Sequence, residues 1–418
     1  MMLQETKKTG IHYAWKIMIS CCALYITVGL LNNTQGLYYP AICADLGCKT
    51  SAFTFITVIS GLAAMLALGI VDRVYNKYQT RWVLFLMITI YAGTFYLRTL
   101  VRSFWAFYII YIVMGIASAF LIYVPIPMLI NIWFKERRGF ALGVSLLMSG
   151  ISAAISSPII SRSIESIGWQ KTSALNALIG FAVSAPIVLI FVRNKPQDIG
   201  LLPYGANEAD AEEYEAAMSE TKKAAGSKIS LGSLGEEKRI KLIICFIMAV
   251  ILMLIAGIYH QFATFAESIG VSSAVGAALL SLDMVGNMGS KAIQGVCIDR
   301  FGSRKTLTVS FVLVMISMIF LCMYNVPALL YAGALLTGIS AANNGIAIPV
   351  MLESFSDGEE YVYCISRVTM GTMLATAFAT YIGNAIYDIC GTYTVEFVLY
   401  AVLQLVCLVL MWIILKKK

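Results

Sequence analysis

The chain has 418 residues, of which 59% are hydrophobic and only 13% are charged. Soluble domains carry about 25% charged residues, so this composition excludes an ordinary soluble protein and indicates one that crosses a membrane many times. The formal net charge is +7, and the placement of the basic residues accounts for it without a nucleic-acid partner.

Twelve apolar segments follow one another, each near the ~20 residues that a helix needs to span a bilayer. They are residues 14–36, 53–71, 82–97, 104–134, 140–160, 174–192, 240–266, 273–298, 307–324, 328–352, 362–387 and 395–415. The first is expected to be a permanent helix and not a signal peptide, because it lacks a small-residue cleavage site. We therefore expect an all-α membrane protein with twelve transmembrane helices.

The basic residues predict how the chain is oriented. Cytoplasmic loops are enriched in Lys and Arg, and most of the basic residues fall in segments that share a side with the two termini. The other side holds only Lys49, Arg98, Arg102, Arg162 and Lys171. We expect both termini to be cytoplasmic, in a multi-pass protein of the plasma or inner membrane.

Residues 194–238 are polar and acidic in the middle, and they divide the spans six and six. They predict a cytoplasmic linker, with a short surface helix near 208–223, between bundles at residues 1–193 and 239–418. The halves echo one another: Asp72-Arg73 follows the second span as Asp299-Arg300 follows the eighth. A transporter built from two related bundles would hold its substrate between them.

The first span is unusually polar in the stretch "LLNNTQGLYYP". Asn33 and Tyr38 are candidates for hydrogen bonds to a substrate, and contacts between helices are the alternative. Arg98, at the outer end of the third span, is expected to be an interfacial anchor. Cys43 and Cys48, in the first outer loop, are expected to be free thiols, although they could pair. No zinc-type spacing appears, so no metal or other cofactor is expected.

A lysine lies inside the eighth span. Lys291 is eight residues before Asp299, which marks the inner end of the span. At 1.5 Å per residue it lies about 12 Å into a core about 30 Å thick, near mid-depth. Since a lysine there costs roughly 2.5–3.5 kcal/mol, we interpret it as the binding site for an anionic substrate. Structural pairing and snorkelling are the alternatives.

Other polar residues accompany it. Asp283 and Asn287 precede Lys291 at helical spacing and predict a polar stripe. Asp283 is either a proton site or a satisfied polar residue near the outer mouth. His260, toward the outer end of the seventh span, either completes a proton relay or is structural. Arg367, near the start of the eleventh span, is either a second anion ligand, a snorkelling residue or the partner of a nearby acid (Glu353, Glu359 or Glu360).

The loop "GVCIDRFGSRK" resembles the major facilitator pattern G-x-x-x-D-R-x-G-x-R-K. The resemblance implies a fold of two pseudo-symmetric six-helix bundles. It also implies a conformational latch at the inner helix ends, with orientation by positive charge alone as the alternative. The latch candidates are Gly295, Asp299, Arg300, Gly302 and Arg304, with Asp72 and Arg73 in the degraded counterpart after the second span.

The stretches "NIWFKERRGFALG" and "RNKPQDIGLLPYG" resemble the bacterial oxalate/formate antiporter family and its monocarboxylate-transporter relatives. In that family an arginine eight residues before the loop aspartate binds the substrate carboxylate, and Lys291 stands at its position. The resemblance also carries over Tyr123, in the fourth span. The chain departs from the pattern at Asn287, where monocarboxylate transporters often have aspartate. It departs again at Asn343 and Asn344, where the antiporter has an aromatic cage.

Together these residues predict a secondary transporter of a small organic anion, a mono- or dicarboxylate. Its site would combine Lys291, Asn287, Tyr123, Tyr38, Asn33 and Arg367. Protons or a counter-anion would couple transport, and a monomer would suffice. The alternatives are an exporter of drug-like, cationic or neutral compounds on the same fold, and a transporter-like sensor. An enzyme is not expected, because no nucleophile–base pair converges in the spans.

Overall fold

The computed structural model describes residues 12–206, 234–356 and 358–415. These residues form helices joined by short turns, and the β-type contact among them is an isolated bridge between Phe134 and Tyr204. Ten of the described helical segments are long and apolar enough to cross a membrane. Helices of 29 and 33 residues, in the eighth and eleventh positions, complete the twelve expected spans. The all-α membrane fold is confirmed.

The first half of the chain supplies the first six spans. Their elements are α1 (Tyr13–Val28), η1 (Gly29–Asn33), η2 (Gln35–Tyr38), α2 (Tyr39–Leu46), α3 (Thr50–Lys77), α4 (Thr80–Leu97), α5 (Phe104–Ser118), η3 (Ala119–Tyr123), α6 (Pro125–Trp133), α7 (Arg138–Ile167) and α8 (Trp169–Phe191). The helices extend beyond the apolar segments, most of all in the first span, which continues to Leu46.

The second half supplies the other six. Its elements are α10 (Glu236–Ala256), η6 (Gly257–Gln261), α11 (Phe262–Ser268), α12 (Ser273–Phe301), α13 (Ser303–Cys322), α14 (Pro327–Glu353), α15 (Gly358–Cys390) and α16 (Thr394–Ile414). The turn between α12 and α13 needs Gly302, whose φ of 82° lies in the left-handed region that favours glycine.

Within the described residues, three spans are interrupted helices. The first passes through a π turn (η1) and a 3-10 turn (η2), the fourth through a π turn (η3), and the seventh through a 3-10 turn (η6). In the fourth span, Pro125 lacks a backbone N–H and therefore begins a new helix after η3. Turns of this kind are common at functional sites, and inside a membrane they need polar partners in the protein interior.

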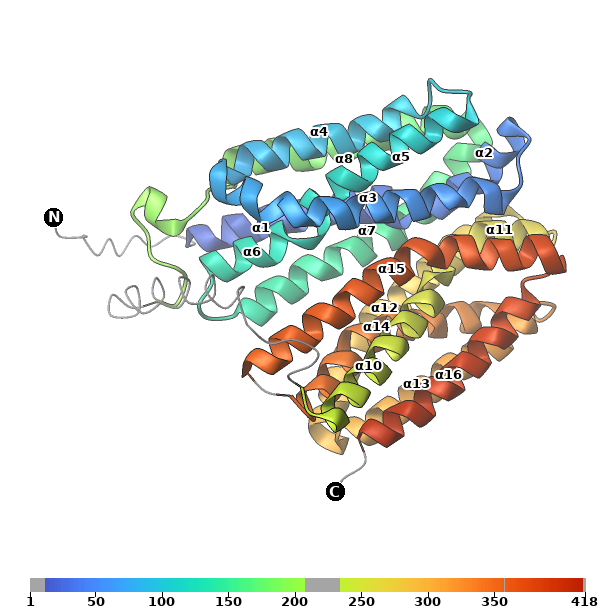
Figure 1. The fold of residues 1–418 in the computed structure, drawn as a ribbon. Helices are drawn as coiled ribbons and strands as arrows, with labels where there is room; N and C mark the ends of the chain where they lie inside the picture. Colours follow the sequence, from blue (N-terminus) through green and yellow to red (C-terminus); the bar gives the residue numbers. More distant parts are fainter. Residues whose placement is uncertain (1–11, 207–233, 357, 416–418) are drawn as a thin grey trace.

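The helices form two groups, α1–α8 and α10–α16, shown in Figure 1. The groups converge at one end and diverge toward the side where α1 begins and α16 ends. We call that side the terminal face and the opposite side the distal face. The division of the chain into bundles at residues 194–238 stays a prediction.

Close contacts join the two groups in their distal halves. The Ser161 and Ser273 hydroxyls lie 2.8 Å apart, which joins α7 to α12. A Cβ placed on Gly36 would lie 2.1 Å from the carbonyl oxygen of His260, so η2 and η6 touch through their backbones. We call this set of contacts the distal seam. In membranes such close approach at small residues supplies the packing energy that holds helices together.

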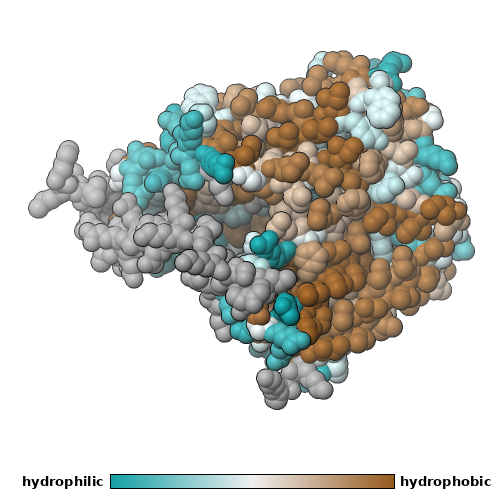
Figure 2. Space-filling view, viewed as in Figure 1, coloured by the Kyte–Doolittle hydropathy of each residue, from teal (hydrophilic) through white to brown (hydrophobic). Residues whose placement is uncertain are grey.

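Large apolar side chains cover the outside of both groups. Figure 2 shows hydrophobic residues over the visible faces, with hydrophilic residues toward the two ends. Trp105 of α5 and Ile293 and Val296 of α12 are among the exposed apolar side chains, at 73%, 64% and 55% exposure. A belt of this kind is what a lipid environment requires, and it identifies the lipid-facing side of each helix.

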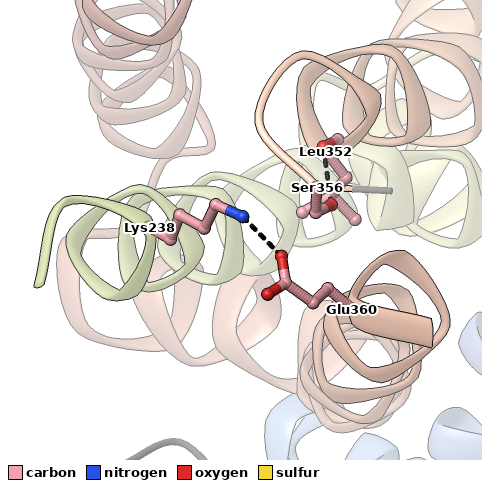
Figure 3. A network of polar contacts seen from close by, with 4 residues as sticks. All are labelled: Lys238, Leu352, Ser356 and Glu360. Carbon is pink, nitrogen blue, oxygen red and sulfur yellow. Dashed lines mark hydrogen bonds and ion pairs between the residues drawn. The ribbon is translucent and has the colours of Figure 1, made fainter. Parts of the chain in front are cut away.

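The described ends of the linker lie at the terminal face. Tyr204 exchanges backbone hydrogen bonds with the end of the fourth span, since its N–H donates to the Trp133 carbonyl at 2.9 Å and its carbonyl accepts from Lys135. Lys238, in the first turn of α10, forms an ion pair of 2.5 Å with Glu360 of α15 (Figure 3). The surface helix expected at 208–223 lies outside the described residues.

Candidate functional site

Lys291 lies on the side of α12 that faces away from lipid. At about 100° per residue it is roughly 200° and 140° round the helix from the lipid-facing Ile293 and Val296. Met288, one turn earlier, packs against Gly150 of α7, so this side of α12 faces the N-terminal group. Lys291 lies on the same side of α12, one turn nearer the terminal face. Its side chain is exposed. Among the described residues, no carboxylate forms an ion pair with it.

Asp283 lies elsewhere, inside the C-terminal group. It is 3% exposed, and the Thr337 hydroxyl of α14 donates a hydrogen bond of 2.7 Å to its carboxylate. A Cβ on Gly338 would lie only 2.1 Å from the Asp283 carbonyl oxygen, which shows how closely α12 and α14 pack here. Asn287 is half-buried between these environments, and its side-chain oxygen has no hydrogen-bond partner. The predicted stripe is therefore divided between the bundle interior and the space between the groups.

A cavity of about 110 Å³ lies between the two groups. Both groups contribute polar residues to it: Asn32, Gln35, Tyr39, Thr57, Tyr111, His260 and Thr376. Met65, Met114 and Met373 supply apolar surface. None of the described residues that line it is an Asp, Glu, Lys or Arg.

His260 borders this cavity from η6. Its ring lies 4.0 Å from that of Tyr259, and its Nδ1 is buried without a hydrogen-bond partner. Asp283 faces α14, and the structure describes no contact between it and His260. The two residues are therefore not brought together as a relay, and the coupling role of each stays a prediction.

The first-span candidates separate as well. The Asn33 amide of η1 lies 3.9 Å from the sulfur of Met284 in α12, so it reaches across between the groups. Tyr38 is only 1% exposed and lies inside the N-terminal group, where its hydroxyl accepts a hydrogen bond of 2.5 Å from Asn176. The side chain of Tyr123 lies outside the part that the structure describes.

Arg367 is exposed on α15, toward the terminal face, with its guanidinium 5.1 Å from the centre of the Tyr363 ring. Glu360, one of its three possible acidic partners, is bound to Lys238 instead. Neither a ligand role nor a structural role for Arg367 is tested by this placement.

The latch candidates lie at the terminal face. Arg73, Asp299 and Arg300 are exposed, and no ion pair joins Asp299 to a basic side chain within the described ranges. Arg304 stacks on Trp412 of α16, with 4.1 Å from the guanidinium carbon to the ring centre. Gly295 is exposed on α12, and the side chain of Asp72 is not described. The latch stays a prediction.

The expectation that Arg98 is an interfacial anchor is wrong. Arg98 directly follows α4 and is only 1% exposed, so its side chain is not an anchor at the membrane surface. Its guanidinium lies over the rings of Tyr38 and Phe95. The apolar run ends one residue earlier, at Leu97. Hydropathy alone cannot tell an interfacial arginine from one whose side chain points into the bundle.

Glu396 is a buried residue that no sequence pattern singled out. It lies in the first turn of α16, where the helix dipole ordinarily stabilises a negative charge. Its side chain is 0% exposed and lies against Tyr400 and Gln261. A Cβ on Gly383 would lie 2.2 Å from its carboxylate, so glycine makes room for it. Cys43 and Cys48, as favoured from the sequence, are free thiols.

Comparison with known proteins identifies the fold. The family model described as Major Facilitator Superfamily matches residues 21–287 and 242–418. A mutant form of the nucleoside transporter NupG aligns with a TM-score of 0.72 at 13% identity, over 97% of this chain and 100% of that one. A D-xylose-proton symporter aligns with a TM-score of 0.68 at 12% identity, over 96% and 97%. At these identities the structures show the fold alone.

Sequence relatives match only part of the chain. The MFS-type transporter pynF of Aspergillus niger is 26% identical over 44% of this chain and 43% of its own length. Monocarboxylate transporter 12-B of Danio rerio is 24% identical over 44% of this chain and 39% of its own length. The chain thus spans less than half the length of these relatives.

Proposed function

The chain belongs to the major facilitator superfamily, and from that premise we propose that it carries a small organic anion, a mono- or dicarboxylate. It is a multi-pass membrane transporter that works by alternating access, exposing its site first on one side of the membrane and then on the other. Its substrate class is our inference from the charges that face the space between the helix groups.

The position of Lys291 carries this proposal. The lysine lies on the face of α12 opposite the lipid side and is exposed. It belongs to the half of α12 nearer the terminal face, where the groups diverge. A cation in a space with low-dielectric walls concentrates anions there, because the walls focus its field. With no carboxylate paired to it among the described residues, its charge is available to a substrate carboxylate.

Neighbouring polar groups would complete the site. The unpartnered side-chain oxygen of Asn287 lies one turn away on α12, and Asn33 approaches the same helix from the N-terminal group. We include Arg367 and Tyr123 as further ligands. Tyr38, enclosed inside the N-terminal group, would act on the substrate only through its neighbours.

Transport is coupled in this proposal either to a counter-anion or to protons. A counter-anion would neutralise Lys291 on the return step. Asp283 and His260 are the proton-site candidates. Asp283 is buried on α12, and His260 borders the cavity from η6. Asp299, Arg300 and Arg304, with Asp72 and Arg73, would form latches that break and reform as the terminal ends of the helices move. We place the termini in the cytoplasm, the protein in the plasma or inner membrane, and activity in the monomer.

A second candidate cargo is neutral or drug-like. The cavity between the groups has methionines and neutral polar residues in its lining, and methionine-rich surfaces adapt to ligands of different shape. An exporter of such compounds would need neither Lys291 nor Arg367.

Uptake into proteoliposomes tests the proposal. Labelled formate, lactate and oxalate are the probes, with wild type, Lys291→Ala, Lys291→Arg and the exposed distal control Lys171→Ala. We expect wild type and the Lys171→Ala control to take up one of the probes at the same rate. Lys291→Ala should take it up at least about tenfold more slowly, and Lys291→Arg should retain part of the wild-type rate. Equal transport by Lys291→Ala and wild type would make the lysine structural and favour the neutral cargo.

A further inference from the structure

Arg98 is held in the N-terminal group by groups that do not neutralise it. Its Nε donates a hydrogen bond of 2.7 Å to the Ser173 hydroxyl of α8. The guanidinium carbon lies 4.3 Å from the centres of both the Tyr38 and Phe95 rings. These contacts fix its position, and the ring faces attract a cation. The arrangement is built around the guanidinium and is specific to arginine, which is planar and can stack.

The charge itself has no counter-ion. No ion pair to Arg98 occurs within the described ranges, and both terminal nitrogens are buried without a hydrogen-bond partner of ordinary geometry. Asp45, an acid on α2 at the same end, accepts hydrogen bonds from Trp169 and Gln170 instead. An arginine cannot lose its proton to escape this situation, and a buried charge without a partner is strongly unfavourable.

Two tyrosines connect the guanidinium to the cavity. Tyr39 and Tyr111 lie close enough to Arg98 to be influenced by its charge, and both line the cavity. The Tyr111 hydroxyl faces the guanidinium and is buried without a hydrogen-bond partner of ordinary geometry. A phenol can accept a hydrogen bond and donate one at the same time. Its hydroxyl oxygen is buried in this conformation, so Tyr111 can accept from Arg98 here and would donate to a cavity ligand once the lining side chains shift.

We propose that Arg98 supplies the positive charge for a carboxylate bound in the cavity between the two helix groups, and that the Tyr111 hydroxyl is the donor that contacts this carboxylate. Arg98 is a positioning and electrostatic residue in this arrangement, one side chain behind the cavity wall. Gln35, on the same cavity wall, supplies a second neutral donor. The proposal rests on the proposed transport of an organic anion and adds a second cation to it, in the opposite helix group from Lys291.

The two cations, Lys291 and Arg98, lie at different depths between the terminal and distal faces. Lys291 is exposed in the half of α12 nearer the terminal face, whereas Arg98 follows the distal end of α4. An anion attracted first by Lys291 would meet the field of Arg98 once it lies in the cavity. A substrate without negative charge would gain nothing from either residue.

Concentration dependence of uptake separates these roles. Labelled formate, lactate and oxalate are used with the full chain in proteoliposomes, comparing wild type, Tyr111→Phe, Arg98→Gln, Arg98→Lys and Arg102→Gln, a control at an exposed distal arginine. We expect Tyr111→Phe to raise KM about tenfold with little change in kcat. Arg98→Gln should raise KM about thirtyfold or more, Arg98→Lys should fall between, and Arg102→Gln should match wild type.

Tyr111→Phe keeps the test decisive if Arg98→Gln fails to fold, because it removes only a hydroxyl. Unchanged KM in Tyr111→Phe, or Arg98 variants that lose thermal stability while keeping the wild-type KM, would overturn the proposal. If Lys291→Ala loses uptake while the Arg98 and Tyr111 variants keep it, the anion carrier stands and this inference alone falls. If wild type carries none of the probes, both fall.

Discussion

The two helix groups bury charge of opposite sign. The N-terminal group encloses Arg98, 1% exposed, without a carboxylate partner among the described residues. The C-terminal group encloses two carboxyl side chains, Asp283 at 3% and Glu396 at 0%, and within the described ranges neither forms an ion pair. One group thus holds an isolated cation and the other holds isolated acids.

The difference lies in what each group can do about its charge. A carboxyl can become neutral by taking up a proton and then donate a hydrogen bond. Asp283 accepts a hydrogen bond from the Thr337 hydroxyl, and Glu396 lies against Tyr400 and Gln261, with neither carboxylate oxygen in a hydrogen bond of ordinary geometry. A guanidinium stays charged, and only an anion can neutralise it. The buried charge of the N-terminal group is therefore suited to attract an anion, whereas the buried acids of the C-terminal group are suited to take up protons.

The largest loss of stability is expected when a permanent positive charge replaces a buried acid of the C-terminal group. Glu396→Arg would bury a permanent charge in the C-terminal group, where no described acid other than Asp283 lies buried. We expect it to destabilise the folded protein by about 3 kcal/mol or more, seen as loss of monodisperse protein and a lower Tm in detergent. Glu396→Gln keeps the shape and should stay within about 1 kcal/mol of wild type. Equal stability of the two variants would show that the site is open to water.

An intermediate effect is expected from removing only the proton site. Asp283→Asn retains an acceptor for Thr337 but cannot take up a proton. If Asp283 couples transport to protons, stimulation of uptake by an acid-outside gradient should fall about tenfold while exchange of labelled for unlabelled anion continues. Glu353→Gln, at an exposed acid, should keep the stimulation. Undiminished stimulation in Asp283→Asn would leave His260 or a counter-anion as the coupling agent.

The smallest effect is expected at an exposed pair of opposite charges. Lys238 and Glu360 are 44% and 36% exposed and form the ion pair of Figure 3. Exposed pairs contribute about 0–1 kcal/mol, so a double-mutant cycle with Lys238→Gln and Glu360→Gln should give a coupling energy in that range. A coupling above about 2 kcal/mol would mean that this terminal-face contact has the strength of a buried pair.

Much of the fold followed from the sequence because bilayer thickness sets the length of each apolar segment. The twelve segments match the helical spans, but the interruptions of the first, fourth and seventh spans were not predicted. Gly29 and Gly257 lie within apolar surroundings, and a π or 3-10 turn there depends on tertiary partners: a Cβ on Gly29 would meet the Ser149 carbonyl oxygen at 2.2 Å. Hydropathy contains no information on such contacts.

The candidate site was predicted less completely, and for a related reason. The spacing of Asp283, Asn287 and Lys291 placed them near one face of α12, but periodicity does not say which neighbouring helix that face meets. Asp283 turned out to face α14. Arg98 and Glu396 lie at helix ends, where a charged residue is ordinary, and only the arrangement of neighbouring helices buries them.

The distal seam has a consequence for how occupancy and movement are linked. The carbonyl of His260 touches Gly36 across the seam, while the side chain of the same residue borders the cavity. A cargo that shifts His260 therefore changes the free energy of parting the two groups, and parting them changes the affinity for the cargo by the same factor. In the proposed transporter, cargo binding and the opening of the distal seam would therefore be coupled directly through His260.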